Sequence, residues 1–273
     1  MITSTGNDRI KNIIKLSTST KARREQNAFI SEGVKMFIEA PLARIKEVYV
    51  SEDLVGKITR VIESSEECEE KDLYEKCRKK LDERGYETVS DQVFNKISDT
   101  VTPQGILCVI KKDIQDVGRI IEKNKGKDLR VLVVENIRDP GNLGTIIRTM
   151  EAAGFNLMLA SEGTVDMYNP KVIRSTMGSV FRVPVVYTGD LARDIGLLKE
   201  AGVRVYAANL KGQRFHNEVK AAGRVAVMIG NEARGLSDEA AALADEYIKI
   251  KMHGQVESLN AAVAAAVLMY GLS

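Results

Sequence analysis

The chain has 273 residues, 44% hydrophobic and 29% charged, a composition that excludes a collagen, a disulfide-rich scaffold and a wholly disordered protein. Lysine and arginine (40) nearly balance aspartate and glutamate (38), for a net charge of +2. This balance argues against binding nucleic acid through bulk charge but leaves room for a local basic face. Three cysteines without a Cys-x-x-Cys pair, and only two histidines, argue against disulfides and against a zinc site, so no metal is expected.

The first part of the chain predicts an α/β module of about 110 residues, because helix-like and strand-like patterns alternate. Helices are expected at residues 9–16, 34–40, 69–84 and 92–98, and strands at 28–33, 45–50, 87–89 and 105–111. A helix at 114–122 and a lysine- and glycine-rich stretch at 123–128 follow. We therefore predict a domain at 1–112, a linker at 113–128 and a second domain at 129–273.

The second domain is predicted to contain a parallel sheet. Its first strand, residues 129–135 (LRVLVVE), is apolar enough to be buried on both faces. Further strands are expected at 157–160, 183–187, 204–208, 225–229 and 247–250, several of them separated by helical stretches. The N-terminus lacks the apolar core of a signal peptide, and the longest uncharged run of small and apolar residues, 261–270, is too short to cross a bilayer. These features predict a soluble, cytoplasmic protein without a membrane partner.

Basic residues gather near the start of the chain. Residues 1–27 hold six basic and two acidic side chains, although neither domain is basic as a whole. Lys21, Arg23 and Arg24 are candidate phosphate contacts, and a solvated loop explains them equally well.

Three segments have residues suited to chemistry, each at the end of a predicted strand, where open α/β sheets place their sites. The first is NIRDPGNLGTIIR, residues 136–148, in which Asn142 is a candidate helix cap and Arg148 follows on the helix. The second is VAVMIGNEARGLS, residues 225–237, with Gly230, Glu232 and a Ser237 helix cap. The third is IKMHGQVESLN, residues 250–260, where Ser258 is a candidate cap of the last helix. Taken singly, the first two are equally compatible with an ordinary strand-turn-helix connection and a surface side chain, and the third with a buried last helix that has a polar cap.

Familiar nucleotide and acyl-transfer motifs are missing. The sequence has no G-x-G-x-x-G after a strand, no G-x-x-x-x-G-K-[ST] and no G-x-S-x-G. These absences disfavour an unrelated nucleotide-binding α/β enzyme and a catalytic triad.

Together and in this order, the three segments resemble the SpoU/TrmH family of RNA ribose 2′-O-methyltransferases, part of the SPOUT superfamily. The matching stretches are NIRDPGNLGTIIRTMEAAGF, NPKVIRSTMGSVFRVP, GNEARGLS and IKMHGQVESLNAAVAAAV, which lie within residues 130–273. The stretches KARREQNAFISEGVKMFIEA and GILCVIKK resemble, more loosely, the α/β RNA substrate-binding domain often joined to this family.

The resemblance implies a parallel α/β domain with a deep trefoil knot, a homodimer, and S-adenosylmethionine as cofactor. On the matching positions, the implied cofactor residues are Gly230, Ile250 and Leu259, with Asn209, Met252 and Gly254 as weaker candidates. The implied catalytic residues are Asn142, Arg148, Glu232, Ser258 and Asn260. The implied substrate is RNA, with 23S ribosomal RNA favoured, and Arg138 and Arg174 are added as RNA-binding candidates. One departure is Lys251, where the family often has proline.

Two alternatives remain at this stage: a methyltransferase acting on transfer RNA, and a catalytically silent RNA-binding protein with the same fold. In the implied reaction the enzyme aligns a ribose 2′-oxygen with the methyl donor, and this alignment contributes the larger part of the rate. Arg148 matches the family's proposed general base. Because a free guanidinium stays protonated, we expect it either to lose a proton in a strongly perturbed site or to stabilise the developing alkoxide.

Overall fold

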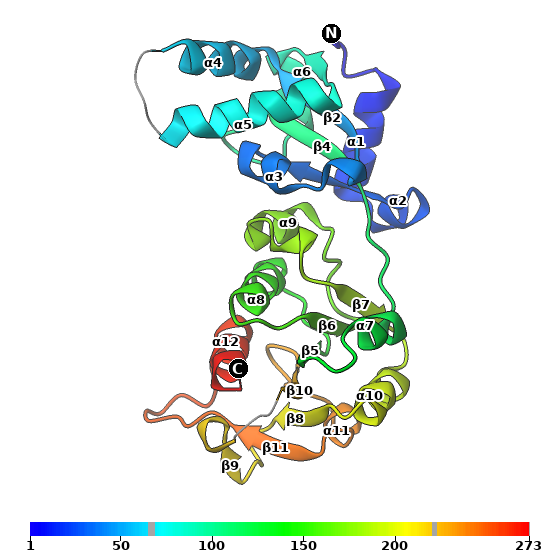
Figure 1. The fold of residues 1–273 in the computed structure, drawn as a ribbon, viewed down its shortest axis with the longest axis vertical. Helices are drawn as coiled ribbons and strands as arrows, with labels where there is room; N and C mark the ends of the chain where they lie inside the picture. Colours follow the sequence, from blue (N-terminus) through cyan, green and yellow to red (C-terminus); the bar gives the residue numbers. More distant parts are fainter. Residues whose placement is uncertain (65–68, 220–222, 273) are drawn as a thin grey trace. The chain divides into compact units, whose positions relative to one another are not determined.

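A computed structural model gives the fold of residues 1–64, 69–219 and 223–272 (Figure 1). Contacts divide the chain into two compact units. Unit 1 is Met1–Asp113 together with Tyr168–Phe181, and unit 2 is Ile114–Met167 together with Arg182–Ser273. Unit 1 therefore takes in a segment from the middle of the chain, which the sequence had placed in the second domain.

Unit 1 is built on a four-stranded sheet in the order β1-β4-β2-β3, in which β4 is antiparallel to both neighbours. The strands are β1 (Ala28–Glu32), β2 (Ile45–Ser51), β3 (Glu87–Val89) and β4 (Ile106–Lys111). The helices are α1 (Asp8–Thr18), α2 (Thr20–Glu25), α3 (Val34–Glu39), α4 (Glu52–Glu63), α5 (Glu69–Arg84), α6 (Asp91–Ile97) and α9 (Pro170–Thr176), with 3-10 turns η1 (Leu42–Arg44) and η2 (Ser179–Phe181).

The core of unit 1 forms where α1 and α6 pack on the sheet. Ile10, Ile13 and Leu16, at helical spacing on α1, bury against strand residues such as Ile30 and Leu107. The predicted elements of this unit are present within a few residues. The helix α4 was missed, although Ser51 caps it by accepting a hydrogen bond from the amide of Leu54.

Unit 2 is built on a seven-stranded sheet in the order β7-β6-β5-β10-β8-β11-β9, and all pairings among its described strands are parallel. The strands are β5 (Leu129–Val134), β6 (Leu157–Ser161), β7 (Val185–Thr188), β8 (Arg204–Ala208), β9 (Arg214–Phe215), β10 (Arg224–Ile229) and β11 (Glu246–Lys249). The helices are α7 (Val117–Lys123), α8 (Pro140–Ala152), α10 (Leu191–Glu200), α11 (Asp238–Ala241) and α12 (Ala261–Gly271), with a 3-10 turn η3 (His216–Glu218).

Both faces of the central strands in unit 2 are buried, as the apolar run at 129–135 predicts. Alternate residues of β5 and β10, including Val131 and Met228, pack with α7, α10 and α11 in one cluster. Leu132 and Val227, which point to the other face, are also fully buried. Helix α12 packs against α8 and β10 (Figure 1). The carboxyl ends of β5, β8, β10 and β11 therefore reach the same edge of the sheet.

Candidate active site

A cavity of about 330 Å³ lies at the carboxyl ends of β8, β10 and β11. Ile229, Leu259 and Leu268 give it apolar walls, and Asn209, Glu257 and Ser258 add polar groups. The predicted site residues that line it are Asn209, Gly230, Glu232, Ile250, Met252, Ser258 and Leu259. The cavity is not lined by Gly254, nor by Asn142, Arg148 or Asn260. Its size and lining are typical of a site for a small organic ligand.

Gly230 lies where two parts of the backbone approach most closely. The turn after it is closed by hydrogen bonds between Asn231 and Gly235, at 3.0 and 2.9 Å. A Cβ atom on residue 230 would lie 2.0 Å from the carbonyl carbon of Gly235, a distance that no real contact tolerates. This position therefore requires glycine, and the loop that borders the cavity depends on it.

Glu232 joins the loop after β10 to the start of α8. Its carboxylate accepts hydrogen bonds from the Asn142 side chain at 3.0 Å and from the backbone amides of Asp139 and Arg138 at 3.2 and 3.4 Å. Partial burial raises the pKa of Glu232, but these hydrogen bonds outweigh it, so the net pKa lies below the ordinary value. Glu232 is therefore held as a carboxylate that fixes the orientation of the α8 terminus.

Asn142 also contacts Asn260, the residue that caps the last helix, α12. Its Oδ1 accepts a hydrogen bond of 3.0 Å from Nδ2 of Asn260. The Oδ1 of Asn260 in turn accepts from the amides of Ala262 and Val263 at the start of α12. The structure thus joins three predicted catalytic residues, Glu232, Asn142 and Asn260, in one hydrogen-bonded chain beside the cavity.

Two predicted helix caps are wrong. Asp139, not Asn142, caps α8, and Pro140 takes the first helical position, where its missing N–H costs nothing. Asn260, not Ser258, caps α12. Both corrections leave the named side chains free for other contacts: Asn142 bonds Glu232 and Asn260, and Ser258 lines the cavity. The cap predicted at Ser237 is confirmed.

Arg148 lies apart from the hydrogen-bonded chain. It is exposed on α8, six residues after Asn142, which is a rise of roughly 9 Å along a helix axis. Within the described part of the chain, no residue forms a hydrogen bond or ion pair with its guanidinium. Three charged side chains at the cavity were not predicted: Lys249 at the end of β11, Arg234 and Glu257. Arg234 and Glu257 lie inside the matched stretches and Lys249 directly precedes one of them, and this position was their only signal.

The predicted RNA contacts differ in their surroundings. Arg23 is only 2% exposed, and its guanidinium donates to the carbonyls of Leu16 and Ser17 and to the hydroxyl of Thr20. The structure therefore contradicts a direct phosphate contact by Arg23, which instead ties α2 to the end of α1. Lys21, Arg24 and Arg138 are exposed. Arg174 is part of an ion pair with Asp99.

A larger cavity, of about 590 Å³, lies in unit 1 between α4, α5 and α6. Lys57 and Glu70 form an ion pair of 2.8 Å in its lining, and no predicted site residue lines this cavity. Among the residues that the structure describes, no cluster of three or more histidine, cysteine or acidic side chains is arranged to hold a metal ion. The helices within the same ranges include none that could span a membrane.

Comparison with known proteins points in one direction. The family model described as the SpoU rRNA Methylase family matches residues 129–270, and an MRM3-like substrate binding domain matches residues 7–108. The chain is 32% identical over 273 residues to the 23S rRNA (guanosine(2553)-2′-O)-methyltransferase RlmP of Bacillus subtilis, covering 99% of this chain and 98% of that protein.

Two further relatives agree. A putative TrmH family tRNA/rRNA methyltransferase of Staphylococcus aureus is 32% identical over 61% of this chain and 68% of its own length. The crystal structure of an AdoMet-bound rRNA methyltransferase from Sinorhizobium meliloti superposes with a TM-score of 0.80 at 28% identity, covering 99% of this chain and 96% of that one. The chain belongs to the SpoU rRNA methylase family.

Proposed function

We propose that the protein transfers a methyl group from S-adenosylmethionine to a ribose 2′-hydroxyl of RNA, with 23S ribosomal RNA as the substrate. The observation that carries this proposal is the hydrogen-bonded chain of Glu232, Asn142 and Asn260 beside the cavity. Three motif residues that are far apart in sequence meet at one place. The 2′-O-methyltransferase named for the Bacillus relative, which matches over nearly the whole chain, supports the choice of reaction and of RNA.

The residues at the cavity suit the proposed cofactor. Apolar walls at Ile229, Leu259 and Leu268 suit an adenine ring, and the polar side chains of Asn209 and Glu257 suit ribose hydroxyls or an amino group. Gly230 keeps its loop close enough for backbone groups to make contact. When bound there, S-adenosylmethionine supplies a methyl group that its positively charged sulfur makes electrophilic.

The chain's own residues then position and polarise the ribose. Asn142 and Asn260 are held by each other and by Glu232, so their remaining hydrogen-bonding groups are fixed before RNA arrives. Ser258 contributes a hydroxyl at the cavity. Arg148 stabilises the developing alkoxide or acts as the general base that takes its proton. Placing the 2′-oxygen in line for attack is the larger contribution, up to roughly 7–11 kcal/mol in well-oriented systems.

We propose that the active form is a homodimer with a knotted second domain, as the family resemblance implies. The composition of α12 supports the dimer, because its small and apolar residues surround the helix on all sides. One side packs on α8, but Val263 and Tyr270 remain 48% and 59% exposed. Burying them against a second copy would also change the surroundings of Arg148, which is exposed on the neighbouring helix α8.

The proposed division of labour follows the two family matches. Residues 1–112 bind RNA, residues 113–128 link the domains, and residues 129–273 carry the methyl transfer, in a cytoplasmic protein. Lys21, Arg24 and Arg138 are exposed basic side chains available to phosphates. Because the acidic and basic residues balance overall, we expect few phosphate contacts and a shallow dependence of RNA affinity on salt.

The decisive experiment is transfer of labelled methyl from S-adenosylmethionine to ribosomal RNA and, separately, to transfer RNA, followed by mapping of 2′-O-methyl positions. Label at one ribose of 23S rRNA supports the proposal. Label confined to transfer RNA would show that the substrate is transfer RNA and not ribosomal RNA. RNA binding without methyl transfer would show that the protein binds RNA but is not a methyltransferase. Arg148→Lys tests the mechanism: a near-normal single-turnover rate and pH profile in that variant would exclude both roles given to Arg148.

A further inference from the structure

Segment 168–181 belongs to unit 1 by its contacts, although it lies within the methylase match at residues 129–270. Tyr168 packs on Phe29 of β1 with ring centroids 4.6 Å apart, and Phe181 lies 6.4 Å from the same ring. Val172 and Ile173 of α9 are buried. These apolar contacts hold the segment in place, so its position does not depend on polar contacts at its surface.

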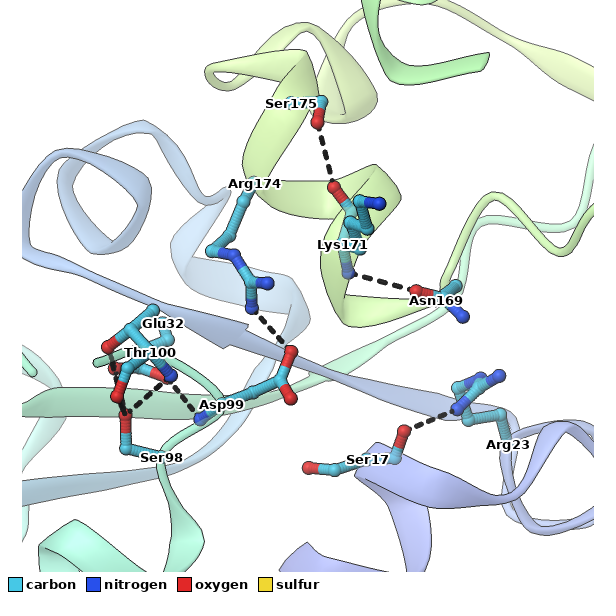
Figure 2. A network of polar contacts seen from close by, with 10 residues as sticks. All are labelled: Ser17, Arg23, Glu32, Ser98, Asp99, Thr100, Asn169, Lys171, Arg174 and Ser175. Atoms are coloured by element: carbon cyan, nitrogen blue, oxygen red, sulfur yellow. Dashed lines mark hydrogen bonds and ion pairs between the residues drawn. The ribbon is translucent and has the colours of Figure 1, made fainter. Parts of the chain in front are cut away.

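One polar contact nevertheless stands out in this segment. Arg174 Nη1 on α9 donates to Oδ2 of Asp99 at 2.6 Å, and Figure 2 shows the guanidinium directed at this carboxylate. Asp99 lies in the loop between α6 and β4, next to Ser98 and Thr100. Partly exposed ion pairs of this kind contribute little to stability.

Hydrogen bonds to Glu32 hold the loop that contains Asp99 in place. Its backbone amide donates to Glu32 Oε2 at 3.2 Å, and the hydroxyls of Ser98 and Thr100 donate to Glu32 Oε1 at 2.6 and 2.8 Å (Figure 2). Glu32 is the last residue of β1, so this loop is tied to the end of a buried strand. The carboxylate of Asp99 is therefore presented to Arg174 in a fixed position, which a freely moving surface aspartate would not be.

Arg174 keeps binding capacity after this contact. A guanidinium has five N–H donors, and only one of them is used in the ion pair with Asp99. The Arg174 side chain is 33% exposed, so solvent reaches part of it. A guanidinium oriented by one carboxylate loses less conformational freedom when its other N–H groups bind a phosphate.

We infer that Asp99 is a positioning residue for RNA: it orients Arg174 so that the remaining N–H groups of the guanidinium bind a backbone phosphate. This inference deepens the proposed function and rests on it for the identity of the ligand. It gives the segment NPKVIRSTMGS a task in unit 1, where RNA recognition is proposed. Asp99 contributes orientation, and Arg174 makes the contact.

The test compares three variants of the full-length protein. Asp99→Ala and Arg174→Ala should each weaken RNA binding about tenfold, as expected for a charged hydrogen bond. Arg174→Ala should also lower the slope of log affinity against log salt by about 1. The affinity for S-adenosylmethionine should stay unchanged. The matched control is Asp82→Ala, which breaks the exposed Arg78–Asp82 pair on α5 and should change neither RNA affinity nor slope.

Two results would overturn the inference. Tighter RNA binding by Asp99→Ala would mean that Asp99 competes with phosphate for Arg174 instead of orienting it. A lower melting temperature with unchanged RNA affinity would mean that the pair is only structural. RNA affinity is measured without cofactor. If the parent protein binds RNA but transfers no methyl group, the proposed function fails while this inference is still decided by the binding data.

Discussion

Two glutamates, one in each unit, organise their surroundings in the same way and to different ends. Glu232 in unit 2 and Glu32 in unit 1 each accept several hydrogen bonds from a neighbouring loop or helix terminus. Through Asn142, Glu232 fixes a chain of amides beside a cavity of about 330 Å³. Through Asp99, Glu32 fixes an arginine, and the pocket beside that pair holds only about 10 Å³.

A carboxylate network therefore does not by itself mark a catalytic site. In unit 2 the network borders space for a small molecule, so orienting side chains can act on a bound ligand. In unit 1 the pocket of about 10 Å³ beside the pair is too small for such a ligand, so the oriented arginine would act on a molecule that docks from outside.

The largest effect is expected from Gly230→Ala. The new Cβ would collide with the Gly235 carbonyl, so the loop at the cavity must move, and binding of S-adenosylmethionine and methyl transfer should fall at least about a hundredfold. Isothermal titration and labelled-methyl transfer measure the two quantities. The control is Gly196→Ala on α10, where a Cβ meets nothing within 4 Å. It should leave binding unchanged and stabilise the fold by roughly 0.5–1 kcal/mol.

The next effect concerns the amide pair. Asn142→Ala and Asn260→Ala should each lower the single-turnover rate roughly 10- to 100-fold, because each removes one fixed group from the site. Since the two side chains share a hydrogen bond, the double variant should lose less than the product of the single losses, with a coupling of about 0.5–3 kcal/mol. Strictly additive losses would show that the two residues act independently.

Replacing each glutamate by glutamine should have a smaller effect, on the transfer rate in one case and on the KM for RNA in the other. Glu232→Gln places an amide group among donors that need an acceptor, so the transfer rate should fall roughly tenfold. Glu32→Gln should instead raise the KM for RNA by a few-fold, because Asp99 loses its fixed position, and should leave the affinity for S-adenosylmethionine unchanged. If Glu32→Gln lowered the saturated rate as much as Glu232→Gln, the contrast between the units would be wrong.

The sequence predicted local elements better than it predicted what holds them together. Residues 69–84 and 204–208 form the expected helix and strand with the same bounds, because their patterns depend on neighbouring residues alone. The caps of α8 and α12 were misassigned because several capping residues stand close together, and only backbone angles decide among them. The sequence predicts Arg23 as a surface cation. Its guanidinium instead donates to the Leu16 carbonyl and the Thr20 hydroxyl, which come within reach only when α1 and α2 pack together.

The candidate site shows the same limit more sharply. Asn142 and Asn260 are 118 residues apart, and no periodicity reports a hydrogen bond over such a distance. Their grouping came from resemblance to a family, and the geometry supplies the physical reason for it. The packing of segment 168–181 in unit 1 had no signal, since Tyr168 and Val172 are ordinary core residues whose partners lie in another part of the chain.

The smallest predicted effect is the pH dependence that Glu232 gives to stability. Its pKa is lowered in the folded protein from an ordinary value of 4.5, so below that value the unfolded chain binds more protons than the folded one. Glu232 therefore adds stability above about pH 4.5, and this contribution is lost as pH falls through the lower, folded-state pKa. Because the residue is exposed, solvent limits the contribution to less than about 1 kcal/mol.

Urea unfolding of the parent protein and of Glu232→Gln at pH 7 and at pH 4 measures this contribution. The parent should be the more stable at pH 7, and the difference should shrink at pH 4. Asp245, whose pKa is also lowered, is present in both proteins and cancels from the difference. A gap that stays constant between the two pH values would mean that the hydrogen bonds from α8 do not favour the ionised carboxylate. The hydrogen bond between Glu232 and Asn142 would then not depend on the negative charge, and a neutral side chain at position 232 could hold Asn142 equally well.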